Sequence, residues 1–153
     1  TVSNGSVTPQ TNLSLSYKLS EKAGLFLWAQ TSEEYSQVYT GPTWTPKPYL
    51  QLGAGVGVEQ AKSPARVGGF VWAGKGPVST LLIMEHGGSG LWYKNQTDLT
   101  LKKGVTLGFQ SQRFAGNGVH VEFQIPETHF TAWGSALGQR DGQTIQVGVR
   151  YNF

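Results

Sequence analysis

Apolar and polar residues alternate with a period of two along most of this sequence. In the C-terminal segment every second residue is apolar: Ile145, Val147, Val149, Tyr151 and Phe153. Successive side chains of a β-strand point to opposite faces, so this alternation predicts a strand with one wholly apolar face. The spacing of an amphipathic helix is hard to find anywhere in the chain. The sequence therefore predicts an all-β protein.

The same one-sided alternation predicts four further strands, at 13–19, 50–59, 105–110 and 119–125. Five other segments are typical of strands without showing which face is buried: 24–31, 66–74, 78–86, 91–101 and 129–138. The segment 34–45 is the least regular. Because Pro42 cannot donate a hydrogen bond to a neighbouring strand, we expect an edge, a bulge or a strand end there.

Short stretches rich in Gly, Pro and Asn separate the predicted strands. A parallel crossover needs about a dozen residues, so the connections are predicted to be antiparallel hairpins that are short on both sides of the sheet. We predict an up-and-down meander of ten or eleven strands, with a twelfth if residues 2–8 contribute one. Residues 1–11 are expected to form a tail or a weak first strand, and residues 12–153 a single β-barrel domain.

A meander of this size must close or be covered, because free strand edges invite further pairing. In a soluble barrel the apolar face points inward, whereas in a transmembrane barrel it contacts lipid. The polar faces here carry Gly, Ser, Thr, Gln and few charges, which suits a confined interior better than bulk water. The mean strand spacing of about 13 residues also fits tilted strands that cross a bilayer.

Composition narrows the function classes. Charged residues make up 14% of the chain, against a usual quarter, and the net charge of +3 is too weak and scattered to indicate nucleic-acid binding. The absence of Cys excludes a disulfide scaffold, a thiolate metal site and a Cys nucleophile. Aromatic residues recur near strand ends, where membrane-interface belts place them, and we assign seven to such belts: Trp28, Trp44, Trp72, Trp92, Trp133, Tyr151 and Phe153.

The final nine residues, IQVGVRYNF, resemble the C-terminal signal of Gram-negative outer-membrane β-barrel proteins. The matching features are the terminal Phe153, the aromatic Tyr151 two residues earlier and the alternating hydrophobic residues before it. This resemblance implies location in the bacterial outer membrane, contact with its lipid and recognition by the barrel-assembly machinery during insertion. It also implies that the last strand closes on the first.

Charged residues on the polar faces are the candidate functional site. We expect five of them to line the interior of the barrel: Glu59, Lys94, Asp98, Glu122 and Arg150. Three more could join them: Arg66, Glu85 and Arg113. They could form structural salt bridges, or a polar constriction that selects solutes by charge. The glycines at 53, 55 and 57 would leave space there or admit bulky neighbours.

Catalytic and metal sites are weakly indicated. His120 and Glu122 share a face, so a base oriented by a carboxylate is sterically possible, and His129 lies one turn away. Glu85 and His86 are adjacent and are expected to point to opposite faces. The histidine spacing predicts no metal site, and the Gly-rich stretches precede no helix, so no cofactor or nucleotide is expected.

The leading hypothesis is a porin-like outer-membrane β-barrel without enzymatic activity. It would act as a narrow passive pore or as a membrane-embedded structural component, either alone or within a larger membrane assembly. A second hypothesis is a soluble calycin-like barrel that binds a hydrophobic ligand; it requires Val121, Val147 and Val149 to point inward. A third is an outer-membrane lipid-modifying enzyme, in which His120→Ala or His129→Ala would abolish activity.

Overall fold

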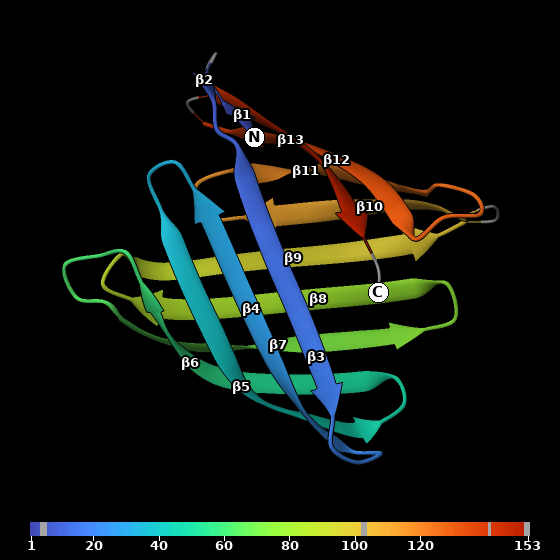
Figure 1. The fold of residues 1–153 in the computed structure, drawn as a ribbon. Helices are drawn as coiled ribbons and strands as arrows, with labels where there is room; N and C mark the ends of the chain where they lie inside the picture. Colours follow the sequence, from blue (N-terminus) through green and yellow to red (C-terminus); the bar gives the residue numbers. More distant parts are fainter. Residues whose placement is uncertain (4–5, 102–103, 141, 152–153) are drawn as a thin grey trace. The chain divides into compact units, whose positions relative to one another are not determined.

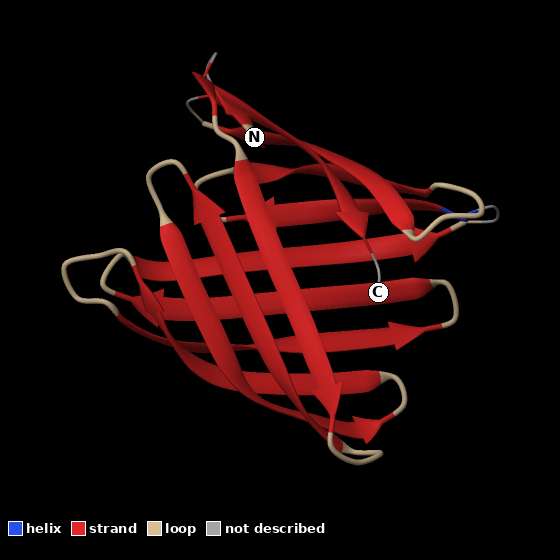
Figure 2. Ribbon diagram, in the orientation of Figure 1, coloured by secondary structure: helices blue, strands red, loops and turns tan. Residues whose placement is uncertain are grey.

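The computed structural model describes residues 1–3, 6–101, 104–140 and 142–151, and these residues form antiparallel β-strands joined by short turns (Figures 1 and 2). No helix among them is long and apolar enough to cross a membrane. The strands are β1 (Val2–Ser3), β2 (Ser6–Val7), β3 (Gln10–Lys18), β4 (Ala23–Ser32), β5 (Ser36–Lys47), β6 (Leu50–Glu59), β7 (Ala65–Lys75), β8 (Val78–Gly87), β9 (Gly90–Thr100), β10 (Val105–Gln112), β11 (Gly116–Gln124), β12 (Phe130–Gln139) and β13 (Gly142–Tyr151).

The predicted all-β meander is confirmed, and each predicted strand corresponds to one of the eleven long strands β3–β13. The strand predicted with least regularity, β5, pairs with both β4 and β6, so the expectation of an edge was wrong. A register shift between Trp44 and Lys47 does mark an irregularity in its pairing with β6. Such a bulge was one of the outcomes expected for a strand that contains Pro42.

The chain divides into two compact units, which we describe separately. The first unit comprises residues 1–7, 74–80 and 94–153, and the second comprises residues 8–73 and 81–93. In the first unit the strand order is β2-β1-β13-β12-β11-β10-β9, with Val2 of β1 opposite Ile145 of β13. The C-terminal strand therefore pairs with the two-residue strand β1 near the N-terminus. Among the described residues β2 and β3 end the strand order, so the barrel closure that the resemblance implied stays a prediction. In the second unit the order is β8-β7-β6-β5-β4-β3.

The strands expose their apolar faces and bury their polar ones. Val56 on β6 and Val147 and Val149 on β13 are 63%, 68% and 65% exposed. On the other faces Glu59, Arg66 and several other polar side chains are almost fully buried. Exposed apolar surface costs about 25 cal/mol per Å² in water, and this cost disappears when lipid covers the surface.

This arrangement contradicts the hypothesis of a soluble calycin-like barrel. That hypothesis requires Val121, Val147 and Val149 to point inward, whereas all three are exposed. The alternation had located the two faces correctly, but alternation alone does not show which face is buried. The buried polar residues supply the missing information.

Aromatic rings pack against glycines on the polar faces. In the second unit a Cβ atom on Gly53 would collide with the ring of Phe70, and one on Gly57 with Tyr39. The ring of Phe26 meets that of Phe70 edge-on, with 5.4 Å between centroids. In the first unit the indole of Trp133 covers Gly148 in the same way. Of the two roles expected for the interior glycines, the structure shows that they admit bulky neighbours.

We expect Gly148→Ala to destabilise the protein by about 1–3 kcal/mol, because the added methyl group would lie 2.7 Å from the indole of Trp133 and force the ring to move. Urea titration of the refolded protein, followed by tryptophan fluorescence, measures this change. Gly134→Ala is the matched control, since a Cβ there meets nothing closer than 3.6 Å. Equal losses in both variants would contradict the packing role of Gly148.

Candidate functional site

Five of the eight charged residues considered as candidates for the interior belong to two groups of hydrogen-bonded side chains, one in each unit. We call the group in the second unit the Arg66 cluster; its members are Tyr35, Glu59, Arg66, Glu85 and Ser89. We call the group in the first unit the His120 network; its members are Gln110, His120, Glu122, Ser135 and Arg150.

Arg66 on β7 is the centre of its cluster. Its Nη1 donates to Oε2 of Glu59 at 2.6 Å, and its Nε donates to Oε2 of Glu85 at 2.9 Å. Less than 5% of each of these three side chains is exposed. Charges removed from water need both an opposite charge and satisfied hydrogen bonds, and this pairing supplies the first requirement.

Two turns supply the remaining hydrogen bonds of the cluster. Tyr35, between β4 and β5, donates its hydroxyl to Oε2 of Glu59 at 2.6 Å. Ser89, between β8 and β9, donates its hydroxyl to the same oxygen at 2.6 Å and its amide to Oε1 at 3.0 Å. Burial and the bond to Glu59 raise the pKa of Tyr35 to about 12, so the phenol remains a donor at neutral pH. The carboxylate of Glu59 therefore fastens two turns to the end of β6.

His120 on β11 links a hydroxyl to a carboxylate in the first unit. Its Nδ1 lies 2.7 Å from the hydroxyl of Ser135, which is its cross-strand partner on β12. Its Nε2 lies 3.1 Å from Oε1 of Glu122. Arg150 on β13 donates to both oxygens of Glu122, at 3.1 and 2.7 Å. Such a two-point contact holds the carboxylate in a fixed orientation.

The order Ser135, His120, Glu122 has the sequence of roles found in a serine hydrolase. The hydroxyl of Ser135, however, also bonds to Oε1 of Gln110 at 3.1 Å, and Ser135 is only 4% exposed. A nucleophile must reach its substrate, and this hydroxyl is covered. The contacts therefore serve to satisfy buried polar groups.

The remaining predicted interior residues are less tightly held. Asp98 on β9 accepts a bond from Gln96 at 2.7 Å through Oδ2, while its Oδ1 is buried without a hydrogen-bond partner. Lys94 lies on the same strand and is partly buried. Arg113 lies in the turn after β10, where its guanidinium covers the ring of Phe114 at 4.8 Å. It therefore belongs to a turn and not to a strand face.

The other histidines stand apart from these groups. His86 is exposed next to the buried Glu85, which confirms that the two point to opposite faces. His129 is exposed in the turn before β12, with its ring 5.8 Å from that of Tyr151. Across the described part of the chain, no three His, Asp or Glu side chains gather closely enough to hold a metal ion.

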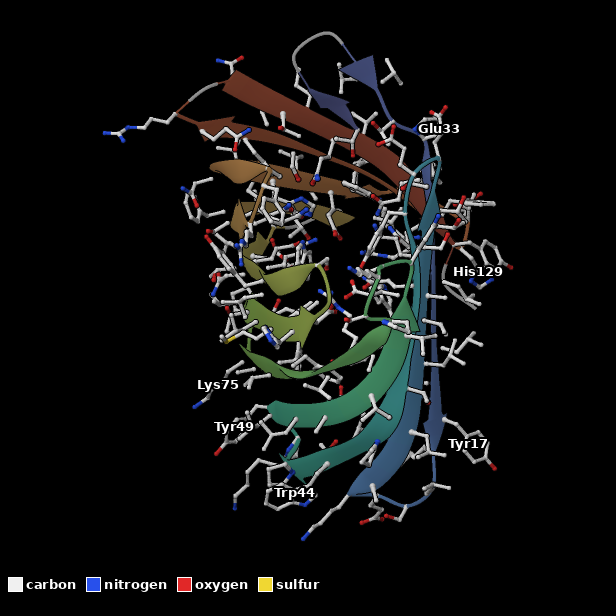
Figure 3. The ribbon with its side chains drawn as sticks, turned by 90° about the vertical axis from the view of Figure 1, so that its left-hand side faces the viewer. Tyr17, Glu33, Trp44, Tyr49, Lys75 and His129 are labelled. Carbon is white, nitrogen blue, oxygen red and sulfur yellow. The ribbon has the colours of Figure 1, made fainter. Side chains whose placement is uncertain are left out.

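The predicted interface aromatics divide between the two faces. Trp44, which extends away from the sheet in Figure 3, and Tyr151 are 56% and 45% exposed. Trp28 pairs with the buried Tyr39, and Trp72 pairs with Gln51.

Two further tryptophans share the polar face. Trp133 pairs with Glu122, and Trp92 lies partly buried between the exposed Leu91 and Tyr93. Four of the five tryptophans thus lie on the face opposite to the one expected of a lipid-facing belt, and Phe153 lies outside the described residues. The assignment of Trp44 and Tyr151 to a membrane interface stays a prediction.

Sequence reasoning missed the uncharged members of both groups, namely Tyr35, Ser89, Gln110 and Ser135. Serine and glutamine are too common in this chain to be informative singly. A signal was nevertheless present for Ser135: counting outward from the turn at 125–129 places position 135 opposite position 120. The turn geometry needed to fix that count is not visible in the sequence.

Neither the known family models nor the curated proteins include a match to this sequence. Among solved structures, the fold matches the KdgM porin with a TM-score of 0.66, and the KdgM porin in complex with disordered oligogalacturonate with a TM-score of 0.67. In both comparisons 14% of residues are identical, and the match covers 94% of this chain and 92% of the other. This chain therefore has the up-and-down β-barrel fold of an outer-membrane porin.

We expect Arg66→Met to destabilise the protein by about 3–5 kcal/mol, because it leaves Glu59 and Glu85 buried without a cation. The urea midpoint of the protein reconstituted in lipid reports the loss. Adding Glu85→Gln to this variant should recover part of it by removing one uncompensated charge. Arg140→Met, in an exposed turn, is the control and should have little effect. A small loss in Arg66→Met would show that the cluster contributes little to stability.

Proposed function

We propose that this protein is an integral β-barrel of the bacterial outer membrane that acts as a narrow passive pore. The observation that carries the proposal is the exposure of the apolar faces together with the burial of the polar ones, on a chain with a porin fold. An apolar exterior matches lipid, and a polar interior matches water and hydrophilic solutes. The porin neighbours favour a pore over a membrane component with a purely structural role.

The apolar exterior and the C-terminal signal also indicate which partners we propose for the barrel. Outer-membrane lipid would cover exposed side chains such as Val147, and the barrel-assembly machinery would insert the chain through its C-terminal signal. Association into a larger membrane assembly is compatible with this surface. We propose that the protein does not bind nucleic acid, because its net charge of +3 is small and scattered along the chain. We also propose that it has no enzymatic activity, because the hydroxyl of Ser135 is covered and the fold is that of a porin.

Single cysteine variants test the orientation of the faces, because the natural chain contains no Cys. With the protein in liposomes, Val147→Cys should react with a membrane-soluble maleimide and resist a charged, water-soluble one. The adjacent Gln146→Cys is the matched control; its side chain lies on the polar face and bonds to Gln110. It should show the opposite preference. Labelling of Val147→Cys by the charged reagent alone would contradict the lipid-facing assignment.

Planar lipid bilayers test the pore directly. The purified protein should produce discrete, stable conductance steps, because a polar interior lets water and ions cross. Protein denatured and added without refolding is the control and should produce none. Properly folded protein that inserts into the bilayer and never conducts would show that the barrel is a structural component.

A further inference from the structure

We propose that the pore disfavours anionic solutes and conducts cations and uncharged hydrophilic molecules. This inference rests on the proposed pore function and concerns the chemistry of its interior. The inference is based on the charges of the polar faces of the two units and not on the net charge of the chain. The chain as a whole is positive at +3, so its composition alone would suggest the opposite preference.

Carboxylates outnumber cations in the two groups and their neighbours on the polar faces. Four acidic side chains lie there: Glu59, Glu85, Asp98 and Glu122. Three basic ones accompany them: Arg66, Lys94 and Arg150. The balance of four negative against three positive charges is −1. Arg150 is also half exposed, but it is counted because it is bound to Glu122. Lysines at strand ends, such as Lys18 and Lys75, are exposed to the solution, where salt screens their charge.

Both arginines are already bound to carboxylates. Arg66 contacts Glu59 and Glu85, and Arg150 uses two nitrogens to contact Glu122. Favourable passage of an anion requires cationic side chains that can bind it in turn. An anion that sought either arginine here would have to displace a glutamate. The guanidinium groups therefore provide little attraction for a passing carboxylate.

One carboxylate on the polar face, that of Asp98, is only partly satisfied by hydrogen bonds. Asp98 has a buried Oδ1 atom without a hydrogen-bond partner, and Gln96 bonds only to Oδ2. Lys94, on the same strand, interacts electrostatically with both Asp98 and Glu122 and balances part of their charge. The carboxylate of Asp98 attracts cations that pass it and repels anions. Asp98 is therefore the residue at which we expect the selectivity to be most sensitive to substitution.

Uncharged solutes meet a different set of groups. Nε2 of Gln110, on β10, donates both to Oε1 of Gln112 on the same strand and to Oε1 of Gln146 on β13. Gln110 is fully buried, so the amides of Gln112 and Gln146 are the ones that a solute can meet. The indole of Trp133 lies on the same face of the first unit. Amides offer both donors and acceptors to hydroxyl groups, so this face suits hydroxylated molecules without charge. The KdgM porin has been seen with an anionic sugar, oligogalacturonate, and the interior of this chain predicts a different preference.

Reversal potentials in a KCl gradient across a planar bilayer test the charge preference. The natural chain should be cation-selective. Asp98→Asn, which removes the charge and keeps a side chain of similar shape, should shift the reversal potential towards the equilibrium potential of chloride. Glu122→Gln, which frees Arg150, should shift it in the same direction and provides a second test if Asp98→Asn does not fold. Glu33→Gln is the matched control, because Glu33 lies in an exposed turn (Figure 3), and it should leave the potential unchanged.

Liposome swelling tests the solute preference. Vesicles that contain the protein should swell faster in a neutral oligosaccharide than in an oligogalacturonate of equal length. Anion selectivity in the natural chain, or faster swelling in oligogalacturonate, would overturn this inference and leave the pore intact. The absence of both conductance and swelling would overturn the proposed pore function itself, so the two failures are distinguishable.

Discussion

Backbone hydrogen bonding is the constraint on which this structure depends. Hydrocarbon offers no partner to an amide or a carbonyl group, so each strand that faces lipid must satisfy its backbone through its neighbours. The long strands do so by pairing in sequence order, and β13 finds a further partner in β1. Where the backbone is satisfied in this way, apolar side chains such as valine and leucine cover most of the outer faces, with few polar side chains such as His86 among them.

The same constraint determines the chemistry of the polar faces. Polar side chains that cannot point outward must satisfy one another, which explains why Arg66 holds two glutamates and why His120 bridges Ser135 and Glu122. Glycine has a part in this arrangement, because it lets the rings of Tyr39 and Trp133 lie close to the sheet. The result is an interior assembled from charge pairs, amides and aromatic rings, with few of the aliphatic contacts that stabilise a soluble domain.

The strands and their faces could be predicted from the sequence because alternation is a local property. The same alternation places Glu59 and Glu122 on the polar faces, because their neighbours along the strand are apolar. Their role as pore-lining residues stays a prediction. The partners of those charges depend on register, which the turns determine, so the contacts of Ser135 and Ser89 were not predictable. The tryptophans show a second limit. Tryptophan is common at the membrane interfaces of membrane proteins. Only the pairing of their strands shows that Trp72 and Trp133 lie on the polar face.

The short turns have a consequence for regulation. Connections between the long strands run from two residues, as at 88–89, to five, as at 60–64 and 125–129. None of these connections is long enough to fold back across an opening, so the turns between the long strands do not provide a movable gate. Any change in the width of the interior would instead depend on side chains of the polar faces. Such changes are fast and local, and they require no rearrangement of the backbone.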